Sequence, residues 1–165
     1  MQPNVFDRIS NVTGKLTSWL TLLMVLVTVV IVVMRYIFDA GFVWMQESVT
    51  WMHAAVFMLG ASYTLLHDDH VRVDIFYRKM TPRRRGWVDL AGLLLFLLPL
   101  CGYLAWAAID FAAVSWSLHE TSREPGGLPY PWIPILKSIV VVMPVLVGLQ
   151  GVSLARQSIR RIREG

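Results

Sequence analysis

Four long uncharged hydrophobic runs divide the chain, and shorter polar segments separate them. The runs contain no Asp, Glu, Lys or Arg and cover residues 16–34, 48–66, 90–109 and 138–155. A helix rises about 1.5 Å per residue and a bilayer core is about 30 Å thick, so each run can cross a membrane. The pattern predicts an all-α membrane protein, a single membrane domain over residues 1–165, with four transmembrane helices at about 16–35, 46–66, 87–110 and 133–155.

Basic residues in the connections predict how these helices are oriented. The chain has 15 Lys and Arg against 11 Asp and Glu, and most of the basic residues lie in the two tails and in segment 67–86. Because Lys and Arg concentrate on the cytoplasmic side of membranes, both termini and loop 67–86 are predicted to be cytoplasmic. Segments 36–45 and 111–132 are then external. Beside membrane spans, this charge does not favour binding to nucleic acid.

Two segments on the predicted cytoplasmic side have the composition of amphipathic interfacial helices. Before the first span, apolar residues recur at helical spacing at Val5, Ile9, Val12 and Leu16. This spacing predicts a short helix that lies at the membrane surface and leads into the span. Residues 70–80 mix apolar and basic side chains, and we expect a second interfacial helical segment there, ended by Thr81-Pro82.

A group of polar and aromatic residues is expected where the first two spans meet the outer surface. Its members are Arg35, Tyr36, Trp44, Glu47 and Trp51. Trp and Tyr anchor helices at membrane interfaces, and Glu47 is predicted to pair with Arg35. Deeper in the second span, Gly60 favours close packing against a neighbouring helix, and we count all of these residues as candidates for a subunit or membrane interface.

A second polar group follows the second span and includes His70, Arg72 and Asp74. His and Asp this close together can bind a metal, but the segment is a wet loop without an implied geometry. Capping of the helix end and contact with a partner subunit explain the group better, so we predict neither a metal nor a cofactor. The single cysteine, Cys101, is expected to pack inside the third span.

The order and spacing of several motifs carry a family resemblance. The motifs are Arg35-Tyr36-x-Phe38, Trp44-x-Gln46-Glu47, Gly60-Ala61, His70-x-Arg72-x-Asp74 and Gly127-x-Pro129. Together they resemble the small, DctQ-type permease subunit of tripartite ATP-independent periplasmic (TRAP) transporters, over roughly residues 6–150. The chain departs from the family at Gln46-Glu47, where two adjacent acids are common, and Lys137 matches no family feature.

The resemblance implies a subunit of a sodium-coupled symporter in a bacterial or archaeal cytoplasmic membrane, which imports organic acids such as carboxylates or sugar acids. A large multi-span permease would move the substrate by an elevator-type motion, with the small subunit packed against its static part. A periplasmic substrate-binding protein would dock on the outer side, and its footprint is expected to include Glu120, Arg123, Glu124, Gly127 and Pro129. Anionic lipid headgroups are expected at Arg78, Lys79, Arg83, Arg84 and Arg85.

Two other classes of membrane protein compete with this interpretation. A haem-binding redox subunit needs axial ligands that face each other from different spans, and His53 is the only histidine within a predicted span. A small autonomous dimeric transporter with proton coupling needs a carboxylate in the membrane, and no predicted span carries one at mid-depth. The pattern does not indicate an enzyme. The substrate cannot be read from this chain, because its selection would belong to the other components.

Overall fold

The structure, a computed structural model, describes residues 4–67, 77 and 79–164. In this part of the chain all regular structure is helical, and four helices are long and apolar enough to cross a membrane, as the hydropathy pattern predicted. They are α1 (Val5–Ile37), α2 (Val43–Leu66), a joined third helix, and α6 (Trp132–Glu164). The third helix consists of α4 (Pro82–Gly92), a π-helical turn η1 (Leu93–Leu97) and α5 (Leu98–Ser117).

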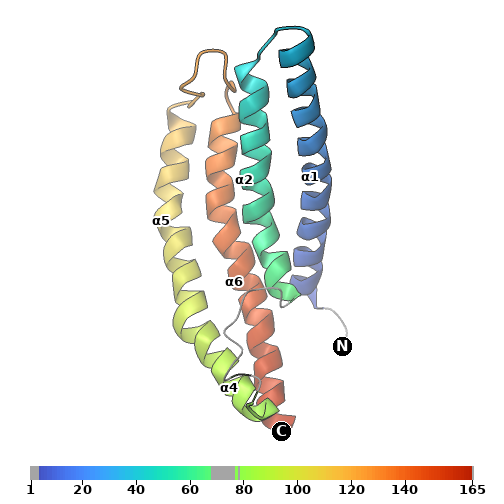
Figure 1. The fold of residues 1–165 in the computed structure, drawn as a ribbon. Helices are drawn as coiled ribbons and strands as arrows, with labels where there is room; N and C mark the ends of the chain where they lie inside the picture. Colours follow the sequence, from blue (N-terminus) through green and yellow to red (C-terminus); the bar gives the residue numbers. More distant parts are fainter. Residues whose placement is uncertain (1–3, 68–76, 78, 165) are drawn as a thin grey trace.

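The four spans stand side by side in one row, in the order α1, α2, α6, α5 (Figure 1). Helix α2 packs against both α1 and α6, and α6 packs against both α2 and the third helix. The outer members of the row, α1 and α5, expose most of their large apolar side chains. A single row therefore leaves two broad faces for lipid or for a partner chain.

Both termini lie at one end of this row, together with α4 (Figure 1). We call this the terminal end, and we call the opposite end, with the α1–α2 connection and segment 118–131, the loop end. Segment 118–131 lies outside the helices, as its prolines and glycines predicted, and Gly126 has a φ of 75°. An even number of spans puts both termini on the same side of a membrane.

Helix α1 corrects one expectation. Residues 5–16 do not form a separate interfacial helix, because α1 runs without a break from Val5 to Ile37. It begins with a capping box in which Asn4 and Asp7 bond each other's backbone N–H groups. The apolar residues of its first turns are exposed, while the buried positions are Asp7, Ser10, Gly14 and Thr17. The small and polar face thus packs inward, and the apolar face remains for lipid.

The third helix begins earlier than residue 87. Thr81 caps it by accepting a hydrogen bond from the backbone N–H of Arg84, and Pro82 occupies its first turn. The basic run 83–85 therefore lies in a helix rather than in a loop. Further along, the helix widens into a π-helical turn just before Pro99, where the ring removes a backbone donor.

Candidate functional site

Glu47 fixes the loop end of the molecule. Its carboxylate, half-buried in the second turn of α2, accepts a hydrogen bond from the Ser122 hydroxyl and another, at 2.6 Å, from the backbone N–H of Leu128. Close by, the backbone N–H of Trp44 donates to the carbonyl of Gly126 at 3.1 Å. These bonds attach segment 118–131 to the start of α2.

Gly127 lies within this attachment, which explains why the position has no side chain. A Cβ at Gly127 would come within 2.6 Å of the nearer carboxylate oxygen of Glu47 and would overlap the Ser122 hydroxyl. The glycine predicted as a docking residue therefore has a structural role, because its backbone must approach Glu47 closely.

The predicted ion pair between Arg35 and Glu47 is wrong. Among the described residues no ion pair joins them, because the Glu47 carboxylate faces segment 118–131 instead. Arg35 and Tyr36 are both exposed at the end of α1, where Tyr36 is 81% exposed. Both residues therefore remain available to lipid headgroups or to another chain.

Three tryptophans line an apolar cavity of about 780 Å³ between α1, α2, the start of α6 and segment 118–131. The Trp51 indole donates to the carbonyl of Trp132 at 2.9 Å, and the two rings meet edge to face with centroids 5.7 Å apart. Trp44 lines the same cavity and is half-exposed, beside Leu128 and Pro129. Such partly exposed indoles are typical of a membrane interface.

Glu120 also belongs to the framework of the loop end. It accepts a hydrogen bond from the Ser115 hydroxyl at 2.7 Å and pairs with the Lys137 ammonium at 2.5 Å. The hydrogen bond from Lys137 holds the pKa of the Glu120 carboxyl below its usual value near 4.5. Lys137 also lies over the Phe111 ring, 4.3 Å from its centroid. A role thus emerges for Lys137, which the motif comparison left unexplained: it ties α6 to α5.

The remaining docking candidates, Arg123, Glu124 and Pro129, are exposed on segment 118–131. Among the described residues, the side chains of Arg123 and Glu124 form neither a hydrogen bond nor an ion pair. The loop end thus presents two free charges on a segment that Glu47 and Glu120 hold in place.

A buried polar cluster at the terminal end was missed by the sequence interpretation. The Asp7 carboxylate accepts hydrogen bonds from Gln150 at 3.1 Å and from Ser153 at 2.8 Å, and Ser10 donates to the Gln150 side-chain oxygen at 2.8 Å. Gln150 and Ser153 are fully buried on α6. The cluster attaches the start of α1 to α6. Its signal was present as the helical spacing of Asp7, Ser10, Gly14 and Thr17.

Glycines permit the closest helix contacts of the row. A Cβ at Gly14 of α1 would overlap the Tyr63 ring of α2, whereas a Cβ at Gly60 would fit at an ordinary contact distance, 4.0 Å from the Thr17 hydroxyl. A Cβ at Gly86 would approach the Ser158 carbonyl of α6 within 3.0 Å. Helices in lipid associate through such small residues, because apolar burial does not favour one neighbour over another.

Several predicted residues of the cytoplasmic segment lie outside the described residues: His70, Arg72, Asp74 and Arg78. Of the other basic candidates, Lys79, Arg83 and Arg84 are exposed, and the Arg85 guanidinium donates to the Met80 carbonyl at 3.1 Å. In the part of the chain that the structure describes, no group of three His, Cys, Asp or Glu residues could hold a metal ion.

The comparison with known families agrees with this architecture. The family model described as "Tripartite ATP-independent periplasmic transporters, DctQ component" matches residues 24–164. No curated protein matches the chain. Because the family match covers most of the sequence and the structure has the expected four membrane-crossing helices, the chain belongs to the DctQ family and is a small membrane subunit of a TRAP transporter.

Proposed function

We propose that this chain is the static scaffold subunit of its transporter. The observation that supports this role is the single row of spans, in which the main polar clusters join helices to one another or to the outer loop. A single row has no interior that could surround a solute. The polar side chains therefore stabilise the row, and substrate movement belongs to a partner with more spans.

The proposed transporter imports an organic acid, such as a carboxylate or a sugar acid, with sodium as the coupled ion. A large permease carries the substrate by an elevator-type motion against this scaffold. The orientation follows from the distribution of basic residues, with the terminal end cytoplasmic and the loop end periplasmic. Exposed Arg83 and Arg84 at the terminal end would then face anionic headgroups.

A periplasmic substrate-binding protein would dock on the loop end. Its footprint would include exposed Arg123, Glu124 and Pro129, while Glu47, Gly127 and the Glu120–Lys137 pair keep this segment in position. Charges at the rim of an interface mainly set association rates, so Glu124 would affect the amount of binding protein required rather than the maximal rate.

Uptake by reconstituted vesicles tests the proposal. Vesicles containing this chain and the large permease should accumulate an organic acid when the binding protein and an inward sodium gradient are present. Vesicles with this chain alone should accumulate none, and omission of the chain should abolish uptake. Uptake by the chain alone would instead establish it as an autonomous transporter.

A further inference from the structure

One face of the α1–α2 pair carries a line of residues along α2, four of which have polar side chains. On α2 the positions follow one another at intervals of three or four residues: Gln46, Thr50, His53, Phe57, Gly60 and Thr64. The first four are exposed. Residues at this spacing share one side of a helix, so the line runs along most of α2.

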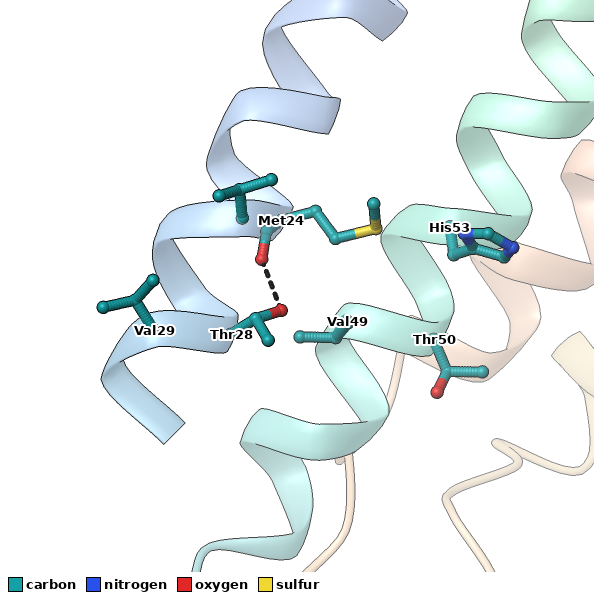
Figure 2. Close-up of a pocket in the computed structure, with 7 residues that line it drawn as sticks. Met24, Thr28, Val29, Val49, Thr50 and His53 are labelled. Atoms are coloured by element: carbon teal, nitrogen blue, oxygen red, sulfur yellow. Dashed lines mark hydrogen bonds between the residues drawn. The ribbon is translucent and has the colours of Figure 1, made fainter. Parts of the chain in front are cut away.

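This face is hollowed into a groove between the two helices. Figure 2 shows its part near the loop end, a cavity of about 400 Å³ lined by Met24 and Thr28 of α1 and by Val49, Thr50 and His53 of α2. A second cavity of about 290 Å³ continues the groove toward the terminal end, between Thr21 and Gly60. We call these two cavities together the His53 groove.

Among the described residues of this line, the side chains of Gln46 and His53 form no hydrogen bond, and of these two only His53 lies deep within α2. The threonine hydroxyls donate to carbonyls of their own helices, as from Thr28 to Met24 at 2.8 Å and from Thr50 to Gln46 at 3.4 Å. The His53 ring contacts Phe57 at 4.7 Å between centroids, but its nitrogens bond to no described residue. At 1.5 Å per residue, His53 lies about 15 Å from the start of α2 and about 20 Å from its end, near mid-membrane.

The outward surface of the third helix, along η1 and α5, gives the contrast. There the exposed side chains at mid-helix are apolar, as at Leu95, Leu100 and Trp106, which are 69%, 57% and 70% exposed. Lipid tails can cover such a surface, but they offer no hydrogen-bond partner to an imidazole at mid-depth. Polar residues within membrane spans normally face protein or a water-filled cavity, so the His53 groove has the character of a protein-facing surface.

We propose that the His53 groove is the surface at which this chain receives a membrane helix of the large permease. The helix would carry a hydroxyl, amide or carboxylate opposite His53, and a bulky neighbouring side chain would fill the cavity beside Thr28. This assignment rests on the scaffold function proposed above. It adds the face that is used and the chemistry that the partner must present.

Photo-crosslinking from defined positions tests the surface. A photoreactive amino acid is placed at position 50 or 53, or at the control positions 95 and 106, and the chain is co-expressed with the large permease. Equal elution from size exclusion shows that each variant is folded. Positions 50 and 53 should yield a light-dependent product that contains the permease by mass spectrometry, and the controls should not. Three results would overturn the assignment: crosslinks to the permease from the control positions alone, a crosslink to a second copy of this chain, or crosslinks to lipid alone.

Substitution of His53 provides the second measurement. His53→Leu should reduce the permease recovered with the chain by about 3-fold to 20-fold, the range of hydrogen bonds between membrane helices. His53→Gln, which retains a donor and an acceptor, should remain within about 2-fold of the wild type, as should Leu95→Ala on the lipid-facing surface. If the wild-type chain retains the permease and His53→Leu retains it equally well, the groove assignment is refuted and the scaffold function still stands. If the wild-type chain does not retain the permease, the scaffold function fails as well.

Discussion

Replacing Glu47 by alanine is expected to release segment 118–131 from the start of α2. The carboxylate holds the segment through the Ser122 hydroxyl and, at 2.6 Å, through the backbone N–H of Leu128. Leu128 is only 7% exposed, so its N–H would lose its acceptor in a place that water reaches poorly. The attachment of the segment therefore depends strongly on this one side chain.

The size of the effect follows from the two bonds. A hydrogen bond to a charged group contributes about 1.5–3 kcal/mol. We count the Leu128 bond in full and the Ser122 bond at about half, because water can replace the latter. The free energy that holds the segment in place should therefore fall by about 3 kcal/mol in Glu47→Ala. Glu47→Gln keeps an acceptor and a donor but loses the charge, which leaves a loss of about 1.5 kcal/mol. Since about 1.4 kcal/mol is a factor of ten, the released population should rise about 100-fold for alanine and about 10-fold for glutamine.

Limited trypsin digestion of the purified chain measures this population, because the segment contains a cleavable site after Arg123. At low protease concentration the cleavage rate follows the fraction of molecules in which the segment is released. The matched control is Gln46→Ala, which alters an exposed neighbour on α2 and should change the rate by less than about 2-fold. Arg35→Gln should likewise change the cleavage rate by less than about 2-fold. If Arg35→Gln accelerated cleavage as much as Glu47→Gln, or if Glu47→Ala had no effect, the assignment of the Glu47 partners would be refuted.

Two further predictions concern helix packing and pH. Gly14→Leu should lower the melting temperature in detergent and reduce the free energy of unfolding by about 1–3 kcal/mol or more, because the new side chain overlaps Tyr63. The control is Gly102→Leu, which should change the melting temperature little because the space around this glycine is open. The native pKa of Glu120 is lowered, so its stabilising contribution is complete above its usual value near 4.5 and is lost as the pH falls through the native value. The difference in melting temperature between wild type and Glu120→Gln should thus be present at pH 7 and shrink as the pH falls well below 4.5, and a difference that grows toward acid would contradict it.

The four spans were predictable because their signal is local. A run of uncharged residues of sufficient length must be a helix in a bilayer, where every backbone polar group needs a partner within the same segment. The order of the spans in a row has no comparable local signal, since lipid and neighbouring helices are equally apolar. It depends on contacts such as the one between Gly14 and Tyr63, and neither residue alone identifies the other.

The hydrogen-bond partners of the polar residues were predicted less well. Opposite charge and a short separation in sequence do not identify which side chains meet in the folded chain. Glu47 was assigned to Arg35, 12 positions before it, whereas its actual partners lie 75 and 81 residues later. Asp7 lies off the apolar stripe of the predicted interfacial helix, and that pattern assigned it no partner. Gln150 and Ser153 give it a buried site instead, and that site exists only once α6 is in place.

The two faces of the α1–α2 pair have different surroundings, and this difference decides how partners could be arranged. On one face, segment 118–131 covers the Trp-lined cavity through Leu128 and Pro129. The residues of the His53 groove lie on another side of both helices, and none of them belongs to that segment. A permease helix could therefore occupy the groove without displacing the segment that Glu47 holds. A binding protein at the loop end and a permease beside the groove would then contact separate surfaces, so Glu47→Ala should disturb docking of the binding protein and leave permease recovery intact.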